Sequence, residues 1–187
     1  MAHGWGLAPG NQISPNETPE LAEAFRKSLE YRKPWEQYNC GSWVGSFSAN
    51  FWARLYDGEM VQTVIDTHFK KAVSPNLTSN FTGYWEIDGN LGITSAIGEM
   101  LMQSHTGEIV LLPALPAKYP DGEVKGLRAR NGIEVNIKWK NNKLVEALIV
   151  SDFGGGVELR YGDNTIGLEL SKGEEKRIKY EDFQKKN

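Results

Sequence analysis

The sequence contains a single cysteine, Cys40, among its 187 residues. One thiol cannot form a disulfide within the chain, and no group of Cys and His residues has the spacing of metal ligands. We therefore expect no disulfide framework, no metal site and no other cofactor. The simplest interpretation of Cys40 is a small, partly buried side chain.

Long hydrophobic runs and an excess of one charge are also missing. No segment reaches the roughly 18 consecutive apolar residues that span a bilayer, so no membrane-spanning helix is expected. The formal net charge is -3, with acidic and basic residues mixed along the chain. This distribution lacks the basic patch of a nucleic-acid-binding protein and the polybasic signal of a membrane-surface protein. Hydrophobic residues make up 40% of the chain, which is enough for a buried core.

What is present in the first half is helical periodicity. Thr18-Pro19-Glu20 is a typical helix start, with an N-cap hydroxyl, a proline at the first helical position and an acid in the first turn. Leu21, Phe25 and Leu29 follow at four-residue spacing, which predicts one apolar face. Pro34 is expected to end this helix.

Three more helices are predicted before residue 107. The second spans about 42 to 57 and is apolar on nearly all sides, which is typical of a buried helix. The third has one apolar stripe between Val61 and Phe69, and the fourth runs from Gly89 to a stop near Gly107. Asp88 therefore precedes the fourth helix, where free N–H groups and the helix dipole favour a carboxylate.

From Glu108 onward the apolar period changes to two. Residues 133–140 and 144–150 flank Asn141-Asn142, which predicts a β-hairpin. Further strands are expected at about 108–112, 157–161, 166–170 and 176–180. We predict an α+β fold with two domains, helical hairpins over residues 1–107 and an antiparallel β-sandwich over residues 108–187.

The segment 83–92, Gly-Tyr-Trp-Glu-Ile-Asp-Gly-Asn-Leu-Gly, contains the most informative carboxylate of the chain. Asp88 is either an ordinary helix N-cap or a carboxylate aimed at a ligand. Gly89 and Gly92 are expected to permit a tight turn into the helix. Ile87 is expected to point the opposite way and to anchor this turn in the core.

The neighbours of Asp88 allow two interpretations each. Trp85 is the better candidate for stacking on a sugar, whereas Trp43 and Trp52 have the helical spacing of core residues. Glu86 could form a carboxylate pair with Asp88, although a solvated or backbone-bonded Glu86 is the simpler interpretation.

Five sequence blocks, taken together and in this order, resemble a known family. His3–Ile13 is similar to S-H-L-x-G-L-x-P-G-x-x-I, and Trp43–Leu55 is similar to W-S-x-A-W-K-x-N-x-W-A-R-L. Glu86–Asn90 resembles Q-I-D-G-N, Ile97–Leu101 resembles I-A-E-M-L, and Glu108–Pro116 resembles G-E-I-x-L-L-P-A-L-P. The chain resembles the C-terminal portion of the family 95 glycoside hydrolases, the inverting α-L-fucosidases and their α-L-galactosidase relatives.

The resemblance implies part of a catalytic (α/α)₆ barrel followed by a C-terminal β domain. It implies that Asp88 is an active-site aspartate that positions the groups attacking the anomeric carbon. His3, Trp85 and Asn90 are the candidate substrate-binding residues, and the implied substrate is a fucosyl or galactosyl oligosaccharide. Family precedent suggests a periplasmic or extracellular bacterial protein, although the compartment is not readable from the sequence.

The resemblance also leaves parts of the site open. The family's general-acid glutamate and paired asparagines lie before the matched region, so this chain alone is expected to hydrolyse nothing. Thr82 stands where the family usually has a substrate-contacting histidine, and Phe47 and Ser48 stand where tryptophan and lysine are common. These departures leave the sugar specificity undetermined. The alternative function is a non-catalytic carbohydrate-binding or structural remnant.

A partner is expected for the helical half. Four helices, one of them apolar on nearly all sides, need cover from other helices, because large exposed apolar patches are unusual. We therefore expect either the remainder of a catalytic barrel or self-association, through the residues Trp43, Phe47, Phe51 and Trp52.

Overall fold

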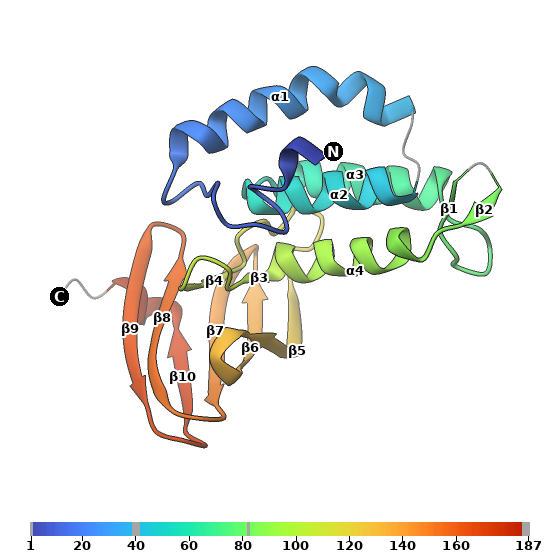
Figure 1. Ribbon diagram of the computed structural model, residues 1–187. Helices are drawn as coiled ribbons and strands as arrows, with labels where there is room; N and C mark the ends of the chain where they lie inside the picture. Colours follow the sequence, from blue (N-terminus) through green and yellow to red (C-terminus); the bar gives the residue numbers. More distant parts are fainter. Residues whose placement is uncertain (1, 39–41, 82, 185–187) are drawn as a thin grey trace. The chain divides into compact units, whose positions relative to one another are not determined.

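The computed structural model describes residues 2–38, 42–81 and 83–184 and divides the chain into two compact units (Figure 1). The first unit ends at Met100 and the second begins at Leu101. Helices make up most of the first unit and strands most of the second, so the predicted α+β class is confirmed. Cys40, which we expected to be partly buried, lies outside the described residues.

The helices and strands of the first unit follow the predicted order, with one added hairpin. They are η1 (Ala2–Gly4), α1 (Pro19–Tyr38), α2 (Ser42–Arg54), α3 (Gly58–Lys71), β1 (Asn80–Phe81), β2 (Tyr84–Trp85) and α4 (Ile87–Leu101). The short strands β1 and β2 pair antiparallel, so the segment before Asp88 is a small hairpin that the apolar pattern did not predict.

Helix α1 begins at Pro19 as predicted, but its C-terminal end and one of its expected buried residues differ from the prediction. It continues past Pro34 to Tyr38, because a proline removes one main-chain hydrogen bond while the other bonds of the helix remain. Phe25 and Leu29 are buried as expected, but Leu21 is 53% exposed. The buried face of α1 therefore begins at Ala22, which is 5% exposed, and not at Leu21.

The connection between α2 and α3 is fixed by one carboxylate. The Asp57 Oδ1 atom caps α3 by accepting a hydrogen bond from the Met60 N–H at 3.0 Å. Its Oδ2 atom accepts a hydrogen bond from Arg26 Nη1 at 2.8 Å, and Arg26 Nη2 donates to the Leu55 carbonyl at 2.7 Å. Arg26 thus joins α1 to the α2–α3 turn through two charge-assisted hydrogen bonds.

Helices α2 and α4 approach closely along a row of small residues. A Cβ added at Gly89 would lie 2.4 Å from Ser42 Cβ, and one added at Gly92 would lie 2.5 Å from Ser46 Oγ. Both glycines lie inside α4 rather than in a turn that precedes it, so the predicted tight turn is wrong. They are required because any side chain there would push the two helices apart.

The apolar residues of the first unit do not expose the surface that we expected. Phe51 and Trp52 are 0% and 1% exposed, so they form the core of this unit and are not available to a partner. Trp43, expected in the core, is 38% exposed. Ile87 is 54% exposed and does not anchor the start of α4, because the hairpin and Ser42 hold that end instead.

A buried histidine of α3 lies against α2 at Gly45. His68 of α3 is 1% exposed, and its Nε2 atom lies 3.0 Å from the Ser79 hydroxyl. Its Nδ1 atom has no hydrogen-bond partner within the described part of the chain and would lie 3.1 Å from a Cβ at Gly45. Burial lowers the pKa of His68 below its ordinary value of 6.5.

The stability of the first unit is therefore expected to fall in mild acid. Below pH 6.5 the unfolded chain binds a proton at His68 that the native chain does not, so stability present above this pH is lost as the pH falls. The maximal slope is about 1.4 kcal/mol per pH unit for one proton. Urea unfolding followed by tryptophan fluorescence between about pH 5 and pH 8 measures this slope.

His68→Leu should flatten this pH dependence, whereas Ser79→Ala should lower stability by a similar amount at every pH. A pH slope that is unchanged in His68→Leu would contradict the assignment to His68.

The second unit contains two four-stranded sheets. Its strands are β3 (Met102–Gln103), β4 (Ile109–Leu111), β5 (Gly122–Ala129), β6 (Ile133–Lys140), β7 (Lys143–Ser151), β8 (Gly155–Tyr161), β9 (Asn164–Leu170) and β10 (Glu175–Lys179). One sheet has the order β10-β7-β6-β5 and the other β3-β4-β8-β9. Neighbouring strands are antiparallel except β4 and β8, which run parallel.

The predicted hairpin of β6 and β7 is confirmed. Asn141 and Asn142 have φ values of 54° and 57°, the left-handed conformation that a two-residue hairpin turn requires. The buried side chains of β6 alternate as expected, at Ile133, Val135, Ile137 and Trp139. Strand β5 was missed because its residues alternate only weakly, and the fourth helix ends at Leu101 rather than near Gly107 because β3 begins there.

None of the helices in the described ranges combines the length and the apolar character that crossing a bilayer demands.

Candidate functional site

A pocket of about 250 Å³ lies between α2 and α4 of the first unit. Its lining residues come from the N-terminal segment, α2 and α4: Ala8, Pro9, Ser46, Phe47, Asn50, Arg54, Asp88, Gly92, Ser95 and Glu99. The four residues from α4 fall within about 60° of each other on a helix with 3.6 residues per turn, so they form a single face. The pocket is therefore built by one face of each helix.

Asp88 stands at the second position of α4, close to the N-terminal end that we predicted for it. Its side chain is exposed and lines the pocket. The Oδ1 atom accepts a hydrogen bond from the Gly89 N–H at 3.1 Å, a contact with the next residue only. The direction of this carboxylate is therefore determined by the helix that carries it.

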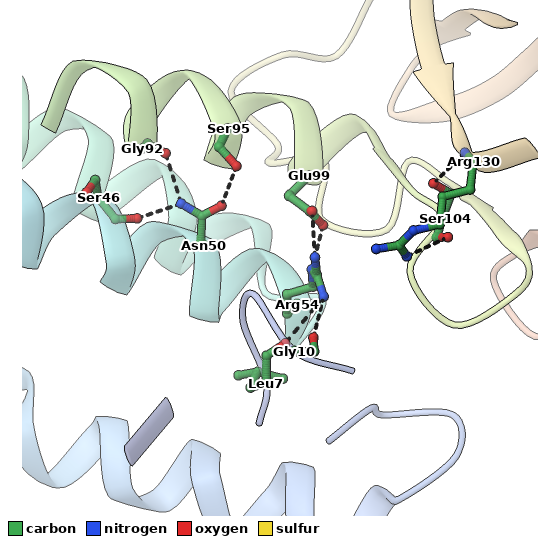
Figure 2. Close-up of polar contacts among 10 residues, drawn as sticks. All are labelled: Leu7, Gly10, Ser46, Asn50, Arg54, Gly92, Ser95, Glu99, Ser104 and Arg130. Atoms are coloured by element: carbon green, nitrogen blue, oxygen red, sulfur yellow. Dashed lines mark hydrogen bonds and ion pairs between the residues drawn. The ribbon is translucent and has the colours of Figure 1, made fainter. Parts of the chain in front are cut away.

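Asn50 forms the polar wall opposite α4. Its Nδ2 group donates one hydrogen bond to the Ser46 carbonyl at 2.7 Å and one to the Gly92 carbonyl at 2.9 Å. Its Oδ1 atom accepts a hydrogen bond from Ser95 Oγ at 3.0 Å. Figure 2 shows this amide between the two helices, with both of its ends engaged.

Arg54 closes the other end of the pocket (Figure 2). Its guanidinium binds Glu99 with two hydrogen bonds, Nε to Oε2 at 2.6 Å and Nη2 to Oε1 at 2.8 Å. Its Nη1 atom also donates to the carbonyls of Leu7 and Gly10 at 3.3 and 3.1 Å. One side chain thus holds the N-terminal segment against α2 and α4.

The two carboxylates of the pocket differ in their availability. Glu99 is held in a bidentate ion pair with Arg54, which occupies both of its carboxylate oxygens. Among the residues that the structure describes, the Asp88 carboxylate has only its local contact with Gly89. Asp88 is therefore the pocket carboxylate that can accept a hydrogen bond from a ligand.

The other candidate residues lie in different places. His3 is exposed and its ring stacks at a tilt on Phe25, with the centroids 5.4 Å apart. Trp85, on β2, is 62% exposed. The Asn90 amide is engaged at both ends, where Oδ1 accepts from the Ser79 N–H at 2.8 Å and Nδ2 donates to the Leu77 carbonyl at 2.8 Å.

Glu86 is bonded to protein groups on both its main chain and its side chain. Its carboxylate accepts a short hydrogen bond from the Ser42 hydroxyl at the start of α2, and its N–H donates to the Ser79 carbonyl at 2.9 Å. The Glu86 carboxylate thus binds a side-chain hydroxyl, which differs from the solvated or backbone-bonded carboxylate that we predicted. The contact joins the start of α4 to the start of α2.

Sequence reasoning did not select Asn50, Arg54, Ser95 or Glu99 as pocket residues. One signal could have found the first two. Asn50 and Arg54 carry the large polar side chains of α2, whose other polar residues are serines, and they lie four residues apart, so they share one face. A metal site is not indicated, because no three metal-ligating side chains gather within the described residues.

Comparison with known proteins identifies the family of the chain. A model of the glycosyl hydrolase family 95 catalytic domain matches residues 1–101, and a model of the glycoside hydrolase family 95 C-terminal domain matches residues 103–186. The two matches meet where the helical unit ends and the β unit begins. The chain belongs to glycoside hydrolase family 95, and the predicted resemblance is confirmed.

Three relatives have names that mention fucosidase activity. Alpha-L-fucosidase 2 of Arabidopsis thaliana is 40% identical over 158 residues, which cover 78% of this chain and 18% of that protein. The probable alpha-fucosidase A of Aspergillus oryzae is 26% identical over 87% of this chain and 24% of its own length. That of Aspergillus niger is 24% identical over 76% and 20%. The chain thus matches about a fifth of the length of each of these relatives.

Proposed function

We propose that this chain contributes part of the sugar-binding site of an α-L-fucosidase-type glycoside hydrolase, with Asp88 as its reactive-site carboxylate. The observation that carries the proposal is the position of Asp88, which lines the pocket at the N-terminal end of α4 without a long-range partner. The family membership and the names of the relatives support the same chemistry.

In this proposal Asp88 orients the group that attacks the anomeric carbon and stabilises positive charge that develops on the sugar. Glu99 does not supply the acid, because its oxygens are engaged by Arg54. The general acid and the water-activating amides come from outside residues 1–187, so the chain alone does not turn over substrate. The substrate is a fucosyl or galactosyl oligosaccharide.

The same proposal assigns the neighbouring residues and the architecture. Trp85 lies on the rim as a stacking surface and His3 contacts substrate from the N-terminal segment. Asn90, expected from the sequence to bind substrate, uses its amide to hold Leu77 and Ser79. The helices form part of an (α/α)₆ barrel, and the two sheets form a β-sandwich. The remainder of the barrel, or a second copy, covers exposed apolar residues such as Trp43.

A binding experiment tests the proposal. A cationic, fucose-configured iminosugar should bind the 187-residue chain, because its charge imitates the charge that develops on the reacting sugar. Asp88→Asn should weaken this binding by about tenfold or more, since it removes one charge-assisted hydrogen bond. Calorimetry or an NMR titration at millimolar ligand measures the dissociation constant.

Asp163→Asn is the matched control, because Asp163 is an exposed carboxylate in a turn of the second unit. It should leave the affinity unchanged. Equal affinities of the wild-type chain and Asp88→Asn would refute the role of Asp88. Absence of binding to the wild-type chain would favour the structural alternative.

A further inference from the structure

The direction of Asp88 depends on the rotation of α4 about its own axis. Its carboxylate has one hydrogen bond, to the adjacent Gly89 N–H, and this bond rotates together with the helix. A shift of α4 by one residue position would turn Asp88 by about 100° and remove it from the pocket. Some contact outside α4 must therefore fix the rotation.

Asn50 makes this contact on the face of α4 that carries Asp88. Gly92 lies one turn after Asp88 and Ser95 lies two turns after it, and all three line the pocket. The Asn50 amide binds the Gly92 main chain and the Ser95 side chain at the same time (Figure 2). A contact to the main chain is informative, because it constrains the helix itself and not only a flexible side chain.

The orientation of the Asn50 amide is also determined. Its two N–H bonds point to two carbonyls, of Ser46 and Gly92, and its oxygen accepts the Ser95 hydroxyl. Reversing the amide would place an oxygen against both carbonyls, which is unfavourable because none of these atoms can donate. The side chain is thus locked to α2 by Ser46 and to α4 by Gly92.

The two other polar contacts described above, which join α2 to α4 or to the residue before it, do not replace this one. Ser42 binds Glu86 before α4 begins, and Arg54 binds Glu99 three turns after Asp88. Each of these two contacts joins a flexible side chain to another side chain, whereas Asn50 reaches the helix main chain near its reactive end.

We propose that Asn50 is a positioning residue, which fixes the rotation of α4 and thereby directs the Asp88 carboxylate into the pocket. The inference rests on the proposed function of Asp88 but not on the identity of the sugar. It assigns to α2 a role in the site that is separate from any contact with substrate.

A double-mutant cycle in ligand affinity tests the proposal. Asn50→Asp keeps the shape of the side chain but replaces its donor by an acceptor that faces two carbonyls. In the wild-type background Asp88→Asn should weaken binding of the cationic iminosugar by about tenfold. In the Asn50→Asp background the same substitution should change the affinity by less than about twofold, because Asp88 no longer faces the ligand.

Two further variants separate positioning from stability. Ser95→Ala removes only the hydrogen bond to the Asn50 amide oxygen. In this background the loss of affinity on Asp88→Asn should lie between the losses in the wild-type and Asn50→Asp backgrounds. Thr94→Ala, on the same helix, removes a bond within α4 from the Thr94 hydroxyl to the Asn90 carbonyl and should leave the effect of Asp88→Asn unchanged. An equal loss of affinity on Asp88→Asn in the wild-type and Asn50→Asp backgrounds would overturn the proposal.

The proposal remains testable if the iminosugar does not bind or if Asn50→Asp does not fold. Absence of binding by the wild-type chain counts against the proposed function, and the crystal structure of Asn50→Asp then decides the role of Asn50. Asn50→Ser replaces it if the aspartate variant is unfolded. A turn of the Asp88 carboxylate away from the pocket supports the proposal, and an unchanged carboxylate contradicts it.

Discussion

Replacing Arg54 with methionine is expected to destabilise the helical unit by about 3–5 kcal/mol, the cost of breaking a buried ion pair on one side. Arg54 is 6% exposed, and the variant would leave Glu99 without its bidentate partner. It would also leave the carbonyls of Leu7 and Gly10 without their donor. Methionine keeps most of the volume of the apolar part of the arginine side chain, so the loss of stability measures the contribution of the polar contacts.

Urea unfolding followed by tryptophan fluorescence measures this effect in the helical unit. Five of the six tryptophans precede residue 100 and only Trp139 follows it, so the signal reports mainly that unit. Urea is preferable to guanidinium, because a salt would screen the ion pair.

Two controls isolate the contribution of burial. Lys27→Met breaks the Lys27–Glu23 pair, whose side chains are 72% and 55% exposed, and should cost less than about 1 kcal/mol. Combining Arg54→Met with Glu99→Met should recover part of the loss, because no unpaired carboxylate then remains. Similar losses for Arg54→Met and Lys27→Met would show that the buried pair has no special importance.

Gly92→Ala should destabilise the same unit by about 1–3 kcal/mol, although alanine is the better helix former. The added Cβ would lie 2.5 Å from Ser46 Oγ and 2.6 Å from Ser46 Cβ, so α2 and α4 would have to separate. The same separation would pull Asn50 from the Gly92 carbonyl, which it binds at 2.9 Å. We therefore also expect the Gly92→Ala variant to bind ligands in this pocket with lower affinity.

Gly98→Ala is the matched control within α4. No atom lies within 4 Å of a Cβ at Gly98, so this variant should stabilise the helix by about 0.5–1 kcal/mol through propensity alone. Ser46→Gly combined with Gly92→Ala should restore much of the lost stability, because it removes the atoms that the new Cβ meets. Thermal or urea unfolding distinguishes the two glycines, and equal shifts for Gly92→Ala and Gly98→Ala would rule out the close helix contact.

Elements with a strong local pattern were predicted well. The four helices and the β6–β7 hairpin follow from apolar periods and from turn residues such as Asn141 and Asn142, which adopt left-handed conformations readily. Elements without such a pattern were missed, among them β5 and the β1–β2 hairpin. Helix ends were also inaccurate, as at Pro34 and Gly107, because neighbouring elements decide where a helix stops.

For the site, the sequence selected one pocket residue and the structure added the others. Asp88 was found because a carboxylate before a helix is a local signal. Asn50, Ser95 and Glu99 were not found, because their roles depend on which face of α2 meets which face of α4. Ile87 and Leu21 were placed in the core on local spacing and are exposed, since spacing identifies a face but not what covers it.

The sequence by itself determined the α+β class, the order of helices and strands, the family and the position of Asp88 near the start of α4. These depend on short-range preferences and on motifs that are read along the chain. Only the tertiary structure decided that Gly89 and Gly92 are contact residues and that Arg54 engages Glu99. It also decided that Asn50 joins α2 to the helix of Asp88. These facts depend on the distance between two helices, which is determined by packing between residues far apart in the sequence.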